Sequence, residues 1–206
     1  MLGPVDATGS GSRKRRPRNA QATRGLLLDA AEVEFSEHGF AGGRIDRIAE
    51  RAGVNKRLIY LYFGDKEGLF GAVLGRHIES VMDRLRLDDG DLVAFAAARF
   101  DYMLANPRVA RLATWRLLER AEPTVDELRS FKSRLATVAA AQRDGLIRSD
   151  IPAADLFAIV LRMSDSWLSA PSALKAAVRG DPMSPRRLRE HRGFLLAAVR
   201  SVTQPA

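Results

Sequence analysis

The chain has 206 residues, 46% of them hydrophobic, which is enough for one compact body and a small additional module. It has no cysteine and three scattered histidines, a composition that excludes disulfides and thiolate metal sites and indicates neither a bound metal nor a cofactor. The formal net charge of +8 favours a polyanionic partner. Apolar runs stay far below the roughly 20 residues of a membrane span, and no apolar signal core begins the chain, so we expect a cytoplasmic protein that does not enter a membrane.

Basic residues are concentrated at the N-terminus, where residues 1–24 include six Lys or Arg and a single Asp. Residues 1–20 are rich in Gly, Pro and Ser and have almost no apolar anchor, so they cannot bury enough surface to order themselves. This composition predicts a flexible basic arm. Its role is open between contact with a polyanion and a solubilising tail.

Three short helices are predicted next. The spacing of Leu27, Ala31 and Phe35 indicates an amphipathic helix over 23–38 that ends at Gly39. Gly53 ends the second helix, and a third begins near Asn55. The second helix has apolar residues three or four positions apart on one face, at Ile45, Ile48, Ala49 and Ala52.

Two helices so close in sequence must cross steeply, as in a helix-turn-helix. In that arrangement the first helix of the pair is buried and the second is free to enter a DNA major groove. The sequence therefore predicts a three-helix DNA-binding domain over residues 21–81.

Further helices are predicted after residue 64, with short polar breaks between them and no stretch whose alternation predicts a strand. The segment 153–168 is apolar on nearly all sides, which indicates burial in a core and in a subunit interface. The predicted class is all-α, with a ligand-binding and dimerisation bundle over 82–206. The expected helices span 65–86, 92–104, 107–120, 123–145, 153–168 and 185–202, with a loop over 170–185.

The third helix carries most of the residues expected to meet DNA. Its front brings Asn55, Lys56 and Arg57 to base edges or phosphates, and one sequence does not say which. Tyr60 and Tyr62, near its far end, each offer a hydroxyl to the phosphate backbone.

Lys66 begins the following helix, where a cation opposes the helix dipole. The position is favourable if a phosphate binds that helix N-terminus, because free backbone N–H groups and the lysine would act together. Arg47 and Arg51, on the preceding helix, are expected to be solvated surface charges.

These residues also carry a family resemblance. Over about residues 21–81 the chain resembles the N-terminal domain of the tetracycline-repressor family of bacterial transcriptional regulators. The matching positions are Thr23-Arg24, Ala30-Ala31, Phe35, Gly39-Phe40, Ile48-Ala49, Ala52-Gly53-Val54, Tyr60, Tyr62-Phe63, Lys66-Glu67 and Leu69. The resemblance implies a homodimer that binds a near-palindromic operator in double-stranded DNA, and a divergent helical domain that binds a small-molecule effector. It also implies DNA contacts by Asn55, Lys56, Arg57, Tyr60, Tyr62 and Lys66.

Two positions depart from the family pattern. Gly42, Gly43 and Arg44 stand where the family usually has a Thr or Ser that caps the helix and touches phosphate. Glycine is an acceptable N-cap, and Arg44 is expected to take over the phosphate contact. Arg57 stands where the family often has a small residue, and a bulky cation there changes which bases are read.

The C-terminal helices are expected to enclose a ligand pocket, although each candidate lining residue is alternatively plain core. Asp165 is unusual on an apolar helix, because a buried carboxylate needs a partner. We expect an internal arginine such as Arg162 or Arg116 to pair with it, in preference to a cationic ligand. The candidate pocket residues are Phe100, Met103, Trp115, Leu118, Met163 and Trp167.

The favoured function is a transcription repressor that a small molecule releases from its operator. The alternative is a non-specific, chromosome-organising DNA-binding protein, which the basic arm alone could support. An enzyme is not expected, because the sequence shows no nucleophile with a base, carboxylate dyad, metal cluster or phosphate-binding loop.

Overall fold

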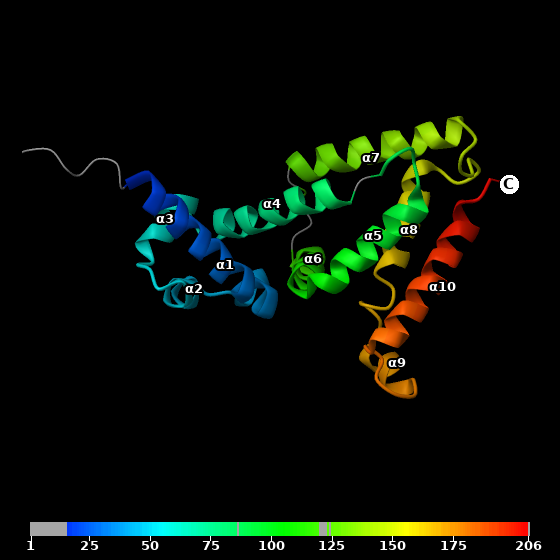
Figure 1. Cartoon of the computed structure of the whole chain (residues 1–206). Coiled ribbons are helices and arrows are strands. Elements are labelled where there is room, and N and C mark those ends of the chain that lie inside the picture. Colours follow the sequence, from blue (N-terminus) through cyan, green and yellow to red (C-terminus); the bar gives the residue numbers. More distant parts are fainter. Residues whose placement is uncertain (1–15, 86, 120–122, 124, 206) are drawn as a thin grey trace, which may run out of the picture. The chain divides into compact units, whose positions relative to one another are not determined.

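The computed structural model describes residues 16–85, 87–119, 123 and 125–205, and all its regular elements are helices (Figure 1). The all-α prediction is therefore confirmed. The first fifteen residues of the predicted arm lie outside the described residues. The helices are α1 (Arg16–Gly42), α2 (Ile45–Ala52), α3 (Arg57–Phe63), α4 (Lys66–Arg84), α5 (Leu92–Ala105), α6 (Pro107–Glu119), α7 (Val125–Arg143), α8 (Ala153–Ser164), α9 (Ser172–Ala177) and α10 (Pro185–Thr203).

The chain divides into two compact units between Val73 and Leu74, inside α4. The N-terminal unit contains α1 to α3 and the start of α4, and the C-terminal unit contains the remaining helices. The domain boundary predicted from sequence, between residues 81 and 82, stays a prediction.

The core of the N-terminal unit forms where the apolar stripes of its helices meet. The rings of Phe35 and Phe70 are in edge contact, with centroids 5.0 Å apart. Ile48 of α2 and Ile59 of α3 are fully buried in the same unit. Burial of these stripes fixes α2 and α3 by one face each and leaves their other faces in solvent.

Helix α1 begins earlier than predicted. It starts at Arg16, whereas the sequence placed a flexible arm up to residue 20 and the helix from Thr23. Residues 18–24 hold no helix breaker, and Pro17 lies in the first turn, where its missing N–H costs nothing. The predicted helix end at Gly39 coincides with a break inside α1, because Gly39 leaves helical geometry with φ 70° and ψ −176° and a short final segment continues to Gly42.

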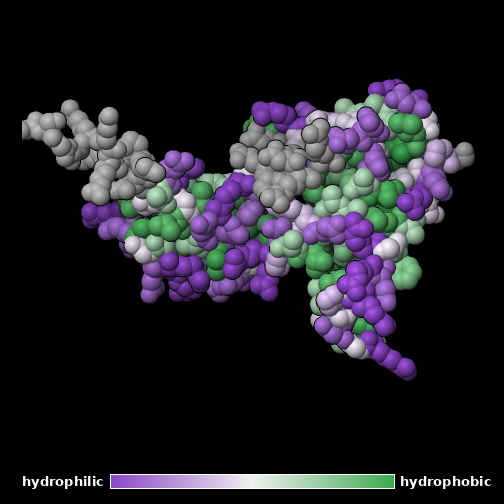
Figure 2. Space-filling model, in the orientation of Figure 1, coloured by the Kyte–Doolittle hydropathy of each residue, from purple (hydrophilic) through white to green (hydrophobic). Residues whose placement is uncertain are grey.

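The C-terminal unit is a helical bundle in which α5 packs on α8 and α10, and α7 packs on α8. Its core contains Phe95, Phe100 and Phe157, and the rings of Phe95 and Phe157 lie 5.3 Å apart. Hydrophobic side chains also reach the visible surface of this unit (Figure 2). The exposed hydrophobic side chains of the unit include Ile159 of α8 and Phe194 of α10, whose exposed fractions are 41% and 70%.

Helix α8 ends at Ser164, four residues earlier than predicted, and a series of turns follows. In these turns Asp165 O accepts from both the backbone N–H of Ser169 at 2.9 Å and the Ser169 hydroxyl at 2.7 Å. The indole Nε1 of the buried Trp167 donates to Pro182 O at 2.9 Å. This bond ties the turn to the segment between α9 and α10.

Candidate functional site

Helices α2 and α3 form the predicted helix-turn-helix. Gly53 ends α2 in the left-handed region, with φ 66° and ψ 30°, and its N–H donates to Glu50 O at 3.0 Å. The N–H of Val54 donates to Ala49 O at 3.1 Å, which completes the turn. A residue with a Cβ would be strained at Gly53, so the glycine allows α3 to begin with only four residues between it and α2.

Asn55 shapes the start of α3. Its side-chain Oδ1 accepts a hydrogen bond from the Arg57 N–H at 2.9 Å, and its backbone O accepts from Leu58 N at 3.0 Å. The residue is therefore a cap that precedes the helix, and α3 begins at Arg57, two residues after the predicted start near Asn55. Its side-chain oxygen is already occupied, which leaves the amide Nδ2 for contact with DNA.

The solvent-facing side of α3 is formed by Arg57, Tyr60 and Leu61. Ile59 on the opposite side is fully buried, whereas 52% of Tyr60 and 72% of Leu61 are exposed. Positions three and four apart lie on one helix face, so these three side chains point the same way. Tyr62 is only half-exposed and meets Phe63 edge-on at 6.4 Å, and its predicted phosphate contact stays a prediction.

Sequence reasoning missed Leu61. The signal was available, because Leu61 lies four positions after Arg57 and two after the apolar Ile59. An exposed leucine on a reading helix matters, because apolar side chains contact the thymine methyl group in the major groove.

Two lysines predicted to contact DNA, Lys56 and Lys66, make contacts within the protein. Lys56 Nζ lies 3.0 Å from Asp46 Oδ1 of α2, and this carboxylate raises the pKa of Lys56. Lys66 Nζ donates to Ala41 O at 3.2 Å and lies 4.8 Å from the centre of the Phe40 ring. Both cations lie in partly or fully exposed positions, where such contacts are weak and exchangeable.

Glu34 caps the N-terminus of α2, a role that sequence reasoning did not assign. Its Oε1 accepts from Arg44 N at 2.9 Å and from Arg47 Nε at 2.7 Å, although only 1% of the side chain is exposed. Arg44 itself, at the N-cap of α2, makes no side-chain cap, and its side chain is exposed. A carboxylate from α1 thus replaces the hydroxyl that the family pattern places before this helix.

The expectation that Arg47 is only a solvated charge was wrong. Its Nη2 also donates to Gly42 O at 3.0 Å, so the guanidinium clamps α2 to the end of α1. Burial tends to raise the pKa of Glu34, but the hydrogen bonds from Arg47 and from the Arg44 N–H outweigh burial and lower it. The carboxylate is therefore charged at neutral pH.

Two glycines allow close approach in this unit. A Cβ at Gly43 would lie 2.7 Å from ring carbons of Phe35, which explains why a Thr or Ser cannot stand there without moving the core. A Cβ at Gly68 would lie 2.0 Å from Phe63 O, at the junction of α3 and α4. Asp65 caps α4 as predicted, with Oδ1 accepting from Gly68 N at 2.7 Å.

Most of the predicted pocket residues lie in or against the core of the C-terminal unit. Phe100, Met103 and Trp167 belong to its buried cluster, and Met163 packs against that cluster from a partly buried position. Trp115 of α6 is also partly buried. The two surface cavities along α7 are lined by other residues, so the predicted pocket stays a prediction.

Asp165 has an internal partner, as expected, but the partner is Arg99. The Arg99 Nη2 and Asp165 Oδ2 atoms are 2.7 Å apart, and Arg116 is engaged by Glu127. Arg99 lies on α5, which packs directly on α8, whereas the sequence pattern gives no information on which helices are neighbours. In the part of the chain that the structure describes, no group of side chains could hold a metal ion, and no helix is long and apolar enough to span a membrane.

Both units match known domains. Residues 27–73 match the family model for bacterial regulatory proteins of the tetR family, and residues 91–200 match the model for the tetracyclin repressor-like C-terminal domain. The first range spans the end of α1 through the start of α4, and so includes the helix-turn-helix.

Three similar proteins extend this match. The HTH-type transcriptional repressor SCO4008 of Streptomyces coelicolor is 32% identical over 177 residues, which cover 84% of this chain and 92% of the relative. The crystal structure of SCO4942 from Streptomyces coelicolor is 33% identical, covers 88% of this chain and 98% of that chain, and has a TM-score of 0.77. The SmeT–triclosan complex has the same fold, with a TM-score of 0.63 at 23% identity over 89% of this chain and 92% of that chain. The chain therefore belongs to the tetR family and is a DNA-binding transcriptional regulator, not an enzyme.

Proposed function

We propose that this regulator binds a near-palindromic operator as a homodimer and that a small-molecule effector releases it. The observation that carries the proposal is the division of α3 into two faces. Ile59 is fully buried while Arg57, Tyr60 and Leu61 are exposed together, as a helix that enters a major groove requires. The proposed DNA-binding domain covers residues 21–81, and the proposed effector and dimerisation domain covers residues 82–206.

The exposed face of α3 offers both a hydrogen-bond donor and an apolar side chain for contact with base edges. Arg57 can donate to O6 and N7 of guanine, and Leu61 can pack on the methyl group of thymine. Asn55 orients Arg57 through its cap and adds its Nδ2 as a second donor. We assign sequence preference to these residues because they reach the groove from one side of the helix.

Phosphate contacts would come from the flanks of the helix-turn-helix. Lys66 at the start of α4, Arg44 at the start of α2, Lys56, Tyr60 and Tyr62 all lie at or near helix ends, where backbone N–H groups or hydroxyls can join them. Lys66 would exchange its bond to Ala41 O for a phosphate oxygen. Binding should therefore weaken steeply as salt rises.

Dimerisation is proposed through α8 and α10. Ile159 and Phe194 are large apolar side chains exposed on these helices, and single-chain exposure of such groups is typical of a surface that a partner covers. Small-molecule control is supported by the triclosan complex of SmeT, a protein of the same fold. The residues proposed for the effector are Phe100, Met103, Trp115, Met163 and Trp167.

The deciding experiment selects bound sequences from a random DNA pool and then measures affinity for the winning site against random DNA. A specific regulator should prefer the winner by at least 10³-fold. Equal affinity for both DNAs would reject the operator proposal and favour the chromosome-organising alternative. The basic charge of the chain is the observation that supports that alternative.

The assignment of Leu61 has its own test. Replacing thymine by uracil in the selected site removes one methyl group per base and should weaken binding by about three- to fourfold where Leu61 contacts it, equivalent to ~0.8 kcal/mol. The Leu61→Ala variant should not distinguish the two DNAs, whereas Leu26→Ala, an exposed leucine of α1, should behave like the parent protein. Discrimination that survives in Leu61→Ala would remove this residue from the set that reads bases.

A further inference from the structure

Arg134 of α7 carries a half-buried positive charge that no carboxylate among the described residues balances. Its Nη2 donates to Leu85 O at 3.1 Å, and its guanidinium carbon lies 5.6 Å from the centre of the Phe95 ring. Among the described residues, no Asp or Glu oxygen lies within 4.0 Å of the Arg134 nitrogens. A backbone carbonyl and an aromatic face orient the group, but neither neutralises it.

A second guanidinium strengthens the positive potential at this point. Arg99 lies one helical turn after Phe95 on α5, and its charge is matched by Asp165 at 2.7 Å. Burial, and then the charge of Arg99, lower the pKa of Arg134. Among the described residues, the two guanidiniums are thus accompanied by one carboxylate, which pairs with Arg99. The charge of Arg134 remains unpaired in a partly desolvated place, where an unpaired charge is costly.

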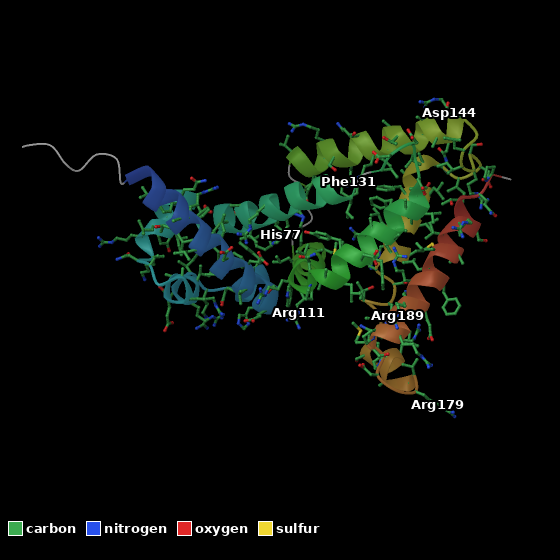
Figure 3. All side chains as sticks on the ribbon, viewed as in Figure 1. His77, Arg111, Phe131, Asp144, Arg179 and Arg189 are labelled. Carbon is green, nitrogen blue, oxygen red and sulfur yellow. The ribbon has the colours of Figure 1, made fainter. Side chains whose placement is uncertain are left out.

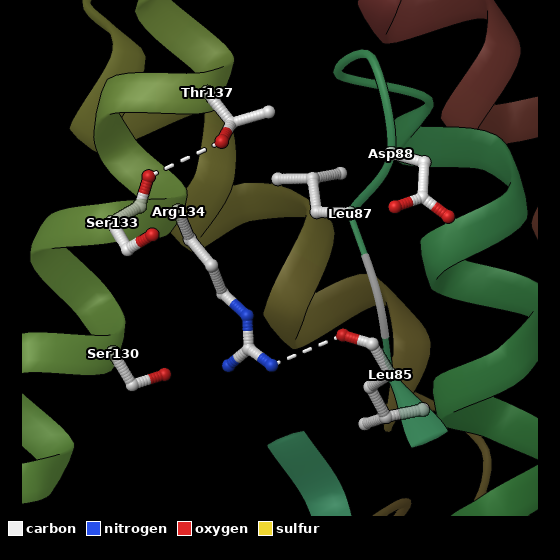
Figure 4. Close-up of a pocket in the computed structure, with 7 residues that line it drawn as sticks. All are labelled: Leu85, Leu87, Asp88, Ser130, Ser133, Arg134 and Thr137. Atoms are coloured by element: carbon white, nitrogen blue, oxygen red, sulfur yellow. Dashed lines mark hydrogen bonds between the residues drawn. The ribbon is translucent and has the colours of Figure 1, made fainter. Parts of the chain in front are cut away.

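A cavity of about 270 Å³ lies beside the Arg134 guanidinium (Figure 4). Its wall combines hydroxyls of α7 with leucines of the segment between α4 and α5. It shares Leu87, Asp88, Ser133 and Thr137 with a larger surface groove of about 810 Å³. The residues that line the smaller cavity are Leu85, Leu87, Asp88, Ser130, Ser133, Arg134 and Thr137.

The acidic residues that the structure describes in the lining of the cavity and groove stand at the outer side of this site. Figure 4 shows Arg134 extending from α7 towards Leu85, with Asp88 on the other side of Leu87. Asp89 and Asp144 line the outer groove and are exposed, and Asp144 lies at the end of α7 away from Phe131 (Figure 3). A ligand with several negative charges would meet these carboxylates, whereas a single negative charge at Arg134 would not.

We propose that this cavity binds a small organic monocarboxylate, whose carboxylate pairs with Arg134 and whose apolar body packs on Leu85 and Leu87. Within the described part of the chain one acceptor, Leu85 O, engages the guanidinium, so it has donors left for the two oxygens of a carboxylate, the geometry that arginine matches best. One negative charge balances the one uncompensated cation. This cavity is separate from the effector residues proposed above, and that a carboxylate bound here also controls release from DNA rests on the proposed function.

The test uses three probes of equal length that differ only in charge, namely hexanoate, hexanamide and hexylamine. Calorimetric titration of the full chain should show hexanoate binding at least tenfold more tightly than hexanamide, and no binding of hexylamine. Arg134→Met, which keeps most of the side-chain volume, should weaken hexanoate binding at least tenfold. Lys132→Met, at an exposed position of the same helix, should leave it unchanged. Equal binding of the three probes, or hexanoate binding that survives Arg134→Met, would overturn the proposal.

Thermal unfolding without a probe separates a binding role from a structural one. If Arg134 serves to hold Leu85 and Phe95, Arg134→Met should lower the Tm. The proposal expects the Tm to stay or rise, since the variant removes an uncompensated buried charge. Hexanoate that binds through Arg134 but does not release operator DNA would contradict the effector role and leave the site in place.

Discussion

The two units differ in how far along the chain their orienting contacts reach. In the N-terminal unit, Asn55 binds a backbone group two residues away, Glu34 and Arg47 are 13 residues apart, and Lys66 meets a carbonyl 25 residues away. In the C-terminal unit the corresponding separations are 49 residues for Arg134 and Leu85 and 66 for Arg99 and Asp165. The proposed DNA-reading surface is thus built from residues near one another in sequence, whereas the cavity along α7 is built from segments that only the fold brings together.

The largest loss of stability is expected at Gly68, where the surrounding atoms leave no space for a side chain. Gly68→Ala places a Cβ 2.0 Å from Phe63 O, and a backbone carbonyl cannot turn aside as a flexible side chain can. Overpacking of this kind should destabilise the N-terminal unit by about 3 kcal/mol. Denaturant unfolding and a gel-shift titration should show loss of stability together with loss of DNA binding.

Gly71→Ala is the matched control, because it lies in the same helix and its Cβ would meet nothing within 4 Å. That variant should be stabilised by up to about 1 kcal/mol through higher helix propensity. If Gly68→Ala bound DNA as well as Gly71→Ala does, the junction of α3 and α4 would not determine the position of the reading helix.

A slightly smaller effect is expected from the long-range pair of the C-terminal unit. Arg99→Met leaves the largely buried Asp165 carboxylate without its guanidinium and should cost about 2–3 kcal/mol. The double variant Arg99→Met with Asp165→Leu should recover most of that loss, because no buried charge then remains. Unfolding curves of the two variants and the parent protein measure this coupling.

The Arg99→Met variant should also show whether the C-terminal unit affects DNA binding. Since α2 and α3 are oriented by contacts within their own unit, Arg99→Met should leave affinity for DNA unchanged under conditions where the protein is folded. A loss of DNA affinity larger than the loss of folded protein would show that the two units are energetically coupled through α4.

The ion pair between Glu34 and Arg47 in the N-terminal unit should make the stability depend on pH. The pKa of Glu34 in the folded protein lies below its ordinary value of 4.5, so its contribution is complete above that value and is lost as pH falls through the lowered pKa. Glu34→Gln should therefore be less stable than the parent by about 1–2 kcal/mol at pH 7, and the difference should shrink below about pH 4. A difference that stays constant from pH 7 to pH 3 would contradict the charged clamp.

The separation in sequence between contacting residues also explains which features could be predicted from the sequence. The break in α1 at Gly39, the end of α2 at Gly53 and the cap of α4 at Asp65 were each indicated by the sequence, because each depends on a few adjacent residues. Glu34 was missed although it lies on the same helical stripe as Leu27 and Ala31, since a carboxylate there becomes meaningful only when α2 is packed against it.

In the C-terminal unit, residues far apart in sequence pair with one another, and the sequence pattern did not predict these pairs. An internal arginine was expected for Asp165, but Arg99 lies 66 residues away, and helical periodicity does not say which helices are neighbours. The candidate pocket residues were chosen for size and adaptability, and the same properties suit a packed core, where Phe100 and Met103 lie.

The smallest effect tests the most local contact of all, the cap that starts α3. Asn55→Ala removes the oxygen that accepts from the Arg57 N–H and should cost about 1 kcal/mol. Asn55→Asp keeps an acceptor there and should retain the stability, but it replaces the amide donor by a negative charge that faces DNA. If Asn55 only caps, the alanine variant weakens binding to all DNA sequences alike. If its Nδ2 also reads a base, both variants change the sequence selected from a random pool, and Asn55→Asp does so without the loss of stability, so comparing the two separates capping from reading.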